Sequence, residues 1–464
     1  MDLKDRTESI RSLRASIEGT NESAARKRIS LLFDEGTFVE IGAFVKQRPT
    51  ELGAVDAAAE GVVTGYGAVN GVLVFAFSQD ISVLKGAVSE MNAEKICNIA
   101  EMARKAHAPL VCMLDSCGVR LHEGIDALAG YGKIIAKLNS MAGETVLVSA
   151  VFGTCAGALS FIPAMADYSV MTENAELFLS SPDVVKARFG SDKAGTAQNA
   201  YENGTVSAIC TSDTDAVEKI KEFISFTCDV YVTEDDINRL TPEIADIISK
   251  DGYDIREVIS SVADDGKSLE LNPGYASNIV TSLINIDCSP VGVVANNGAL
   301  TSAAAEKAAG FIAFCDNCSI PVLTLVDTDG FECDSKENIL NSSLLVTAYM
   351  NAEVPKVTII VGKAYGAGYI SMCSKQTGAD IVYAYPCAEI AALPAETGAV
   401  FMCAQEIIQT EGDPVDGRNA VIEKYRNTIA SPLEAAKRGH VDDIIDIETT
   451  RQLIASSFGM LADK

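Results

Sequence analysis

This chain of 464 residues contains an internal repeat. The segment AEKICNIAEMARKAHAPLVCMLD, residues 93–115, returns as AEKAAGFIAFCDNCSIPVLTLVD, residues 305–327, at an offset of 212. Each copy has helical apolar spacing, followed by a short apolar run that is typical of a buried strand and ends at an aspartate. Further on, VSAVFGTCAGALSF matches VTIIVGKAYGAGYIS at an offset of 209. The repeat predicts two copies of one α/β unit, related by duplication.

The acidic stretch 229–272 lacks the repeat pattern. It contains TEDDINRLTPEIADIISKDGYDIREVI and is predicted to be a helical connector. The connector would separate an amino-terminal domain, residues 1–228, from a carboxyl-terminal domain, residues 273–464.

Composition excludes several classes of function. The chain has 37 Lys+Arg against 64 Asp+Glu, a formal charge of −27, which argues against nucleic acid as a partner because such binding needs a basic face. Its 13 cysteines are scattered through apolar runs and no secretory signal is recognisable, so free thiols in a cytoplasmic protein are expected. The C-x-x-C pair at Cys315 and Cys318 has no second pair, so no metal site is predicted.

The uncharged run at 145–166 is long enough for a bilayer-spanning helix. Its β-branched start, Gly153, Gly157 and Pro163 instead predict a buried strand, a glycine turn and a helix start. We therefore expect no membrane span there.

Each repeat places small residues between a buried strand and a helix, GTCAGA at 153–158 and GKAYGAG at 362–368. The first N–H groups of a helix lack internal partners and carry partial positive charge, so such a loop can hold a phosphate, a carboxylate or an oxyanion. Close helix–strand packing is the alternative, since neither loop is a complete nucleotide-binding motif. Another strand-end glycine accompanies each loop, Gly118 and Gly330. The duplication favours paired anion holes, for two reactants that each develop negative charge on oxygen.

Protein acids and bases are sparse near these loops. No histidine lies near a strand-end serine motif, which argues against a Ser-His-Asp triad. Glu123 would be a candidate base if it were buried, and a solvated or helix-capping carboxylate is the alternative. A base carried by a cofactor would explain why protein acids and bases are sparse here.

The chain resembles the carboxyltransferase subunits of biotin-dependent acyl-CoA carboxylases and of sodium-pumping acyl-CoA decarboxylases. The resemblance spans nearly the whole chain and includes ARKRISLLFDEGTFVE, GVVTGYGAVNGVLVFAFSQD, KICNIAEMARKAHAPLVCMLDSCGVRLHEG, SSPDVVK, NPGYASNIV, FIAFCDNCSIPVLTLVDTDGF, VPKVTIIVGKAYGAGYISM and AAKRGHVDDII. It implies an α/β fold of two tandem crotonase-like domains, each a β-β-α superhelix. It also implies a homodimer or a trimer of dimers, whose active site lies between the amino half of one subunit and the carboxyl half of another.

The resemblance assigns catalytic roles to backbone amides. Those of Gly157 and Ala158 match the family's hole for the thioester enolate, and those of Ala367 and Gly368 match the hole for the biotin ureido oxygen. In the family, carboxybiotin releases CO2, the biotin nitrogen removes the α-proton of the acyl-CoA, and the enolate attacks the CO2. The reverse reaction removes the carboxylate of a malonyl-type thioester. Direction and acyl group remain open among propionyl/methylmalonyl, acetyl/malonyl and glutaconyl types.

The resemblance also implies substrate-binding positions. Gly118, Arg120 and Gly330 belong to the strand-end segments that contact ligands in the family, and Tyr369 and Ile370 are the further substrate-binding positions. Ile370 falls where the family lines the acyl pocket, with a plain core position as its alternative. For the CoA phosphates only local basic residues are available, and solvated surface is the alternative for each: Lys27, Arg28, Lys186 and Arg188.

Missing motifs indicate partners. The chain shows neither an M-K-M biotin attachment site nor a glycine-rich ATP-binding domain. A biotin carboxyl carrier protein is therefore expected as a separate chain, with a biotin carboxylase or a membrane decarboxylase subunit as third component. A cytoplasmic protein, or one peripheral to a membrane pump, fits this set.

Two other functions compete with carboxyl transfer. A biotin-independent hydratase or isomerase of the crotonase type would need a protein base, with Glu123 the candidate. A non-catalytic scaffold would hold a carboxylase complex together without binding CoA.

Overall fold

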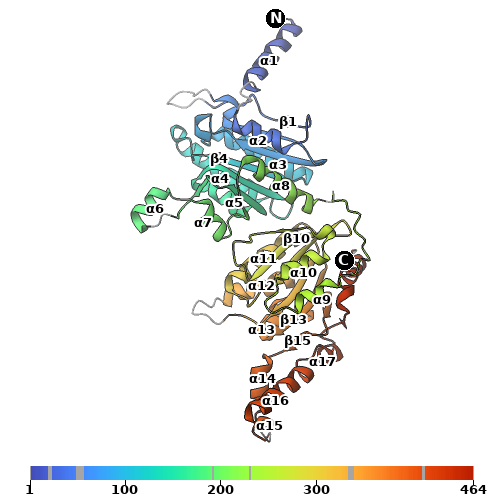
Figure 1. Ribbon diagram of the computed structural model, residues 1–464. Coiled ribbons are helices and arrows are strands. Elements are labelled where there is room, and N and C mark those ends of the chain that lie inside the picture. Colours follow the sequence, from blue (N-terminus) through green and yellow to red (C-terminus); the bar gives the residue numbers. More distant parts are fainter. Residues whose placement is uncertain are drawn as a thin grey trace. The chain divides into compact units, whose positions relative to one another are not determined.

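The computed structural model describes residues 2–18, 23–48, 57–190, 193–228, 231–332, 339–409 and 413–462 (Figure 1). The chain divides into two compact units, Met1–Val230 and Tyr231–Lys464. Each is an α/β unit built on one mixed sheet of similar topology. The stretch that we expected to be a connector supplies α9 (Glu243–Ile248) and α10 (Ile255–Val262), whose buried side chains belong to the core of the second unit.

The sheet of the first unit has the order β1-β2-β3-β4-β5-β6-β8, and β7 pairs with β5. The strands from β1 to β3 pair in antiparallel fashion, and all later pairings are parallel. The strands are β1 (Val39–Glu40), β2 (Val62–Val69), β3 (Val72–Gln79), β4 (Leu110–Ser116), β5 (Leu147–Ala156), β6 (Tyr168–Thr172), β7 (Glu176–Phe178) and β8 (Ala208–Cys210). The helices are α1 (Leu3–Glu18), α2 (Ala24–Leu32), α3 (Glu90–Ala106), α4 (Ile125–Asn139), α5 (Phe161–Met165), α6 (Pro182–Phe189), α7 (Ala197–Glu202) and α8 (Asp213–Thr227).

The second unit repeats this plan with the order β16-β14-β13-β12-β11-β10-β9, and β15 pairs with β13. Its strands are β9 (Ser268–Glu270), β10 (Ile279–Ile286), β11 (Ser289–Asn296), β12 (Val322–Thr328), β13 (Lys356–Tyr365), β14 (Ile381–Ala384), β15 (Glu389–Ala391) and β16 (Asp443–Ile444). The helices after α10 are α11 (Ser302–Asn317), α12 (Ile339–Asn351), α13 (Gly366–Ser371), α14 (Ala395–Met402), α15 (Ala404–Gln409), α16 (Pro414–Thr428), α17 (Pro432–Lys437) and α18 (Thr450–Met460).

Equivalent contacts show that the two units are copies. In the first hairpin Val62 pairs with Gln79, and in the second Ile279 pairs with Asn296. Helices α3 and α11 begin after side-chain N-caps at the repeat offset of 212, Ser89 and Thr301, because a hydroxyl there accepts one of the unpaired N–H groups of the first turn.

Residues 145–166 form strand β5, the 3-10 turn Gly157–Ser160 and helix α5, the order that the sequence predicts. Among the described residues, no helix has the length and apolar character needed to cross a membrane. Near the end of the chain, α14 and α16 pack together around a small core of their own, and α15 lies beside them (Figure 1).

Candidate active site

In the first unit, two glycine turns lie at the ends of the neighbouring parallel strands β4 and β5. Gly118 has φ 119° and Gly157 has φ 68°, conformations that L side chains rarely adopt. The Ser116 hydroxyl accepts the Gly118 N–H at 3.2 Å, which fixes the turn after β4. Gly157 and Ala158 open the 3-10 turn, so their N–H groups are at the start of a helix, where internal acceptors are lacking.

The second unit reproduces this arrangement at the ends of β12 and β13. The Thr328 hydroxyl accepts the Gly330 N–H at 3.1 Å, and Gly330 and Gly366 have φ values of 111° and 51°. Gly366 begins α13, so Ala367 and Gly368 lie in its first turn. A Cβ at Gly368 would lie 3.0 Å from the Gly330 Cα, which shows that the two glycine turns are in contact. The glycine turns that the sequence predicts therefore lie together within each unit.

Two of the repeated glycines follow the packing alternative that the sequence left open, although each packs against the end of a neighbouring strand and not against a helix. A Cβ at Gly153 would lie 2.3 Å from Asp115 Oδ1, and a Cβ at Gly362 would lie 2.5 Å from Asp327 Oδ1. Glycine is needed there because the strand-end aspartate of the neighbouring strand occupies the space. These two glycines make room for the aspartates rather than for a ligand.

Arg120 points into the protein. It is 2% exposed, and its Nη1 lies 2.7 Å from Glu60 Oε2 and 3.4 Å from Glu123 Oε1. Glu60 is fully buried and also accepts a hydrogen bond from the Ser89 hydroxyl at 2.7 Å. In this structure the guanidinium supports the turn after β4, and a direct contact with substrate would require it to leave Glu60. The sequence contained no motif that singles out Glu60.

Glu123 is buried, as a protein base would need to be, but it also caps a helix. Its Oε2 accepts the backbone N–H of Glu90, the first residue of α3, at 2.8 Å, and its Oε1 faces Arg120. Both carboxylate oxygens thus have structural partners, which argues against Glu123 as a free base.

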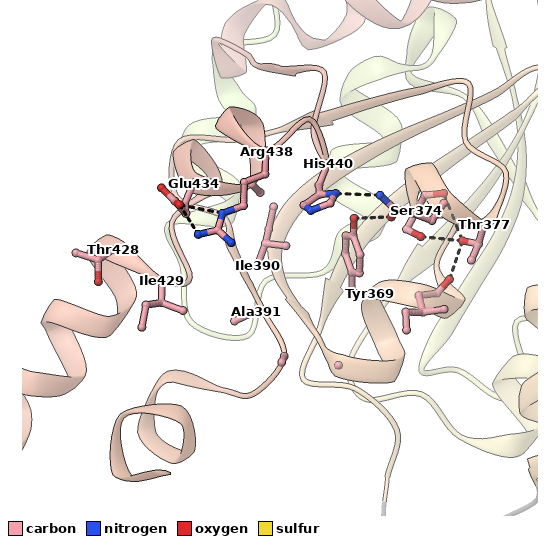
Figure 2. A pocket seen from close by; sticks show the side chains of 15 residues that line it. Tyr369, Ser374, Thr377, Ile390, Ala391, Thr428, Ile429, Glu434, Arg438 and His440 are labelled. Atoms are coloured by element: carbon pink, nitrogen blue, oxygen red, sulfur yellow. Dashed lines mark hydrogen bonds and ion pairs between the residues drawn. The ribbon is translucent and has the colours of Figure 1, made fainter. Parts of the chain in front are cut away.

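The side chains that follow the second glycine turn line two cavities. Ile370 is 49% exposed and borders both a cavity of 950 Å³ and one of 390 Å³. Figure 2 shows the larger one, where the Tyr369 hydroxyl donates to Gln376 Oε1 at 3.1 Å and Gln376 Nε2 lies 3.0 Å from His440 Nδ1. Burial raises the pKa of Tyr369, so its hydroxyl remains protonated. The smaller cavity adjoins the turn itself, because Ala367 is part of its wall.

The basic candidates for the CoA phosphates do not all reach the surface. Arg28 is 5% exposed, and its guanidinium lies 2.9 Å from Asp115 Oδ2 and 2.7 Å from Asp213 Oδ2. It is therefore an internal ion-pair partner, and our expectation of a phosphate ligand or a solvated side chain was wrong for this residue. Lys27, Lys186 and Arg188 are exposed.

The cysteines of the described part of the chain form no disulfide with one another. Burial raises the pKa of Cys112, Cys155 and Cys315, which keeps these thiols protonated. Within the same part, no three His, Cys, Asp or Glu side chains are grouped as a metal site.

Comparison with known proteins identifies the family. Residues 19–464 match the carboxyl transferase domain family. This chain belongs to that family. The methylmalonyl-CoA decarboxylase alpha subunit of Propionigenium modestum is 38% identical over 473 residues, covering 96% of this chain and 91% of the relative. The methylmalonyl-CoA carboxyltransferase 12S subunit of Propionibacterium freudenreichii subsp. shermanii is 38% identical over 469 residues, covering 96% and 89%.

A solved structure gives the same result for the fold. The crystal structure of the transcarboxylase 12S hexamer with hydrolysed methylmalonyl-coenzyme A superimposes with a TM-score of 0.92 at 35% identity, covering 100% of this chain and 96% of that chain. The carboxyltransferase family and the duplicated crotonase-like α/β fold that we expected are thereby confirmed. The enzyme class, acyl-CoA carboxyltransferase, is confirmed at the level of the family.

Proposed function

We propose that this carboxyltransferase moves CO2 between biotin on a separate carrier protein and an acyl-CoA of the methylmalonyl/propionyl type. The observation that carries the proposal is the duplicated glycine turn beside a helix start, Gly118 with Gly157 in one unit and Gly330 with Gly366 in the other. Two such turns suit a reaction in which two reactants each place negative charge on oxygen. The relatives named for methylmalonyl-CoA support the choice of acyl group.

In this proposal the first unit binds the acyl-CoA. The N–H groups of Gly157 and Ala158 donate to the thioester oxygen, whose charge increases as the enolate forms. These two N–H groups are held at the start of the 3-10 turn, and the neighbouring turn is fixed by the Ser116 hydroxyl at Gly118. Donors that are in place before the reaction need no rearrangement during it. The same enolate serves carboxylation and decarboxylation, and the site therefore supports both directions.

The residues of the second unit suit the ureido ring of biotin. The 390 Å³ cavity beside Ala367 has apolar walls from Leu300, Phe331 and Val346, which accept a compact ring and exclude water. The N–H groups of Ala367 and Gly368 would hold the ureido oxygen. When bound in carboxylated form, biotin supplies CO2 and a base, which agrees with the structural roles of both Glu123 oxygens.

The proposed partners follow from the assignment of acyl-CoA to the first unit and of biotin to the second. A biotin carboxyl carrier protein delivers the biotin, and a biotin carboxylase or a membrane decarboxylase subunit completes the system. Relatives include both a decarboxylase alpha subunit and a propionyl-CoA carboxylase beta chain from Roseobacter denitrificans, 36% identical over 475 residues. We also propose that the chain forms a homo-oligomer in the cytoplasm.

The test is biotin-dependent loss of a carboxylate. Purified protein is mixed with methylmalonyl-, malonyl- or glutaconyl-CoA, with and without excess free biotin, and each thioester is followed by chromatography. We expect decarboxylation of methylmalonyl-CoA only when biotin is present. Turnover that is independent of biotin would contradict the proposal and favour a hydratase or isomerase, and failure to bind any CoA ester would favour a scaffold.

A pair of variants tests the proposed oxyanion donors. Ala158→Pro removes one N–H from the first turn, and we expect kcat to fall by about 10²- to 10³-fold with little change in KM. Ala158→Ser keeps the N–H and should retain activity near that of the parent. Equal rates for both variants would exclude this amide as a donor, and circular dichroism confirms folding.

A further inference from the structure

Helix α2 of the first unit and helix α10 of the second occupy equivalent positions. Arg26 of α2 forms a two-bond pair with Glu40 at 2.9 and 3.1 Å, and Arg256 of α10 forms one with Glu270 at 2.7 and 2.8 Å. Both residues of the second pair are 230 positions after those of the first. The buried residues follow the same offset, Ala25, Arg28, Ile29 and Leu32 in α2 and Ile255, Val258, Ile259 and Val262 in α10. Val258 therefore stands where the first unit has Arg28.

In the first unit, Arg28 fills the space beside the strand-end aspartate. Its Nη1 lies 2.9 Å from Asp115 Oδ2, and its guanidinium lies over the Phe152 ring, 4.4 Å from the centroid. Gln79 Oε1 accepts the Asp115 N–H at 3.1 Å. The aspartate of this unit thus has a cationic partner and close neighbours.

In the second unit, smaller residues at these positions are accompanied by a cavity. The counterparts of Arg28, Phe152 and Gln79 are Val258, Val361 and Asn296. The cavity has a volume of 580 Å³, and its wall includes Asp327, Val361 and Asn296. Cavities of this size accommodate small organic ligands or a long side chain. Val361 and Asn296 are smaller than their counterparts and form part of this wall, to which Tyr253 also contributes, whereas Val258 does not reach it.

In the described part of the cavity wall, Asn296 lacks the hydrogen bond that its counterpart Gln79 accepts, and Asp327 has the Tyr253 hydroxyl where Asp115 has a guanidinium. Asn296 is 2% exposed, and within the described residues neither its Oδ1 nor its Nδ2 has a hydrogen-bond partner. Asp327 accepts hydrogen bonds from uncharged donors, the Tyr253 hydroxyl at 2.7 Å and the Lys363 backbone N–H at 2.8 Å. The Nε2 of Gln79 also lacks a partner in the described residues, but its Oε1 is bonded, whereas neither polar atom of Asn296 is. Buried amides are normally satisfied, so the Asn296 oxygen points to a missing ligand atom.

The charge around the cavity is negative. Carboxylates outnumber ammonium groups in its wall, Asp251, Asp327, Asp329 and Glu389 against Lys250 and Lys363. The Lys363 ammonium lies 3.1 Å from Asp329, and the Lys250 ammonium lies 4.0 Å from Glu257 outside the wall. Glu389 interacts with the Tyr365 hydroxyl and with Arg426 Nε. A cation beside Asp327 would therefore be attracted by the surrounding field.

We propose that this cavity binds a guanidinium group, with Asp327 as its carboxylate partner and the Asn296 amide oxygen as a second acceptor. The planar donors of a guanidinium suit a carboxylate and a nearby amide oxygen, and the equivalent aspartate of the first unit already holds one. The ligand is an alkylguanidine or the arginine side chain of another copy of this chain. Both sources offer the same group to the same acceptors.

The test uses the full chain with butylguanidine as probe and butylurea as its uncharged match. Calorimetry and saturation-transfer NMR measure the binding of each probe to the parent and to two variants. Asp327→Asn removes the carboxylate, and Val258→Arg introduces the arginine that the first unit has at this position. We expect butylguanidine to bind at least tenfold more tightly than butylurea, and both variants to lose this preference. Val361→Phe reproduces the other bulky residue and serves as a second filling variant if Val258→Arg fails to fold.

The two sources of the guanidinium give different results. Probe binding to the parent that the variants lose supports a small ligand. If instead an arginine of another copy occupies the cavity, the parent will not bind the probe. The assemblies formed by Asp327→Asn and by Val258→Arg will then dissociate at protein concentrations at least tenfold higher than the concentration at which the parent assembly dissociates. Mass photometry measures these concentrations. Equal binding of the two probes, together with unchanged assembly in the variants, would overturn the proposal.

Discussion

At the residue scale, close approach between neighbouring strands determines which side chains are possible at the strand ends. Gly153 and Gly362 face Asp115 and Asp327 so closely that a Cβ would overlap a carboxylate oxygen. The aspartates are in turn held by their own partners, Arg28 in one unit and Tyr253 in the other. The glycine and the aspartate are therefore one packing unit, although they lie on different strands.

Replacing one of these glycines tests that contact. Gly362→Ala is expected to lower the free energy of unfolding by about 1–3 kcal/mol, because Asp327 must move to admit the methyl group. Gly310→Ala, in helix α11 with nothing within 4 Å of its Cβ position, is the control and should leave stability unchanged or raise it by about 0.5–1 kcal/mol. Urea denaturation measures both, and equal stabilities would contradict the overlap.

The buried ion pair beneath the first glycine turn supports a second prediction. Glu60→Gln leaves the Arg120 guanidinium buried without its main carboxylate, and we expect a loss of about 3–5 kcal/mol in unfolding free energy. Glu94→Gln breaks the exposed pair with Lys133 and should cost less than about 1 kcal/mol. Similar small losses in both variants would show that Arg120 does not depend on Glu60.

At the element scale, helices α3 and α11 are fastened to their hairpins by equivalent buried lysines. Lys95 Nζ donates to the carbonyls of Ala59 and Val62, and Lys307 Nζ donates to those of Tyr275 and Ile279 at 2.9 and 3.0 Å. Burial lowers the pKa of each lysine to about 8. Each helix therefore carries one ammonium that is held by carbonyls next to a strand start.

The lysine pKa predicts a pH dependence. The folded-state pKa of Lys307 lies below its ordinary value of 10.5, so the unfolded chain binds more protons between about pH 8 and 10.5. The contribution of this lysine to stability is expected to rise with pH across that window, by up to ~1.4 kcal/mol per pH unit. Comparing the parent with Lys307→Met by urea denaturation from pH 7 to 10 isolates it, because the cysteines and tyrosines are common to both proteins. A difference that stays constant with pH would contradict the lowered pKa.

At the scale of the whole molecule, exposed apolar side chains favour self-association. Leu121, Ile125 and Leu128 are exposed at and after the first glycine turn, and Ile125 and Leu128 share one face of α4. The homologous transcarboxylase 12S was solved as a hexamer. We name these three residues the α4 patch and expect it to be covered in the assembled protein.

Charge introduced into the α4 patch should reduce the assembly. Light scattering is expected to give the mass of a homo-oligomer for the parent and a smaller species for the double variant Ile125→Glu/Leu128→Glu. Met460→Glu, an exposed apolar residue at the end of α18, is the control and should keep the parent mass. An unchanged mass for the double variant would show that other surfaces hold the subunits together.

The sequence by itself determined the duplication, the helix and strand at 93–115 and 305–327, the strand, turn and helix at 145–166, and the glycine turns at Gly118, Gly157, Gly330 and Gly366. These features are encoded locally, because apolar periodicity, caps and glycines act within a few residues, and the repeat shows them twice. The family followed from the same motifs.

Only the tertiary structure decided which polar side chains face each other. Arg28 forms an ion pair with Asp115, Arg120 forms one with Glu60, and the missing side chain of Gly362 leaves space for Asp327. These partners are separated by tens of residues in the chain, and no short-range pattern relates them. The cavity beside Asp327 likewise depends on side chains from several strands and loops, and its meaning emerges from comparing the packing of the two copies. Burial and charge pairing are properties of the folded arrangement, and for that reason they could not be predicted from spacing alone.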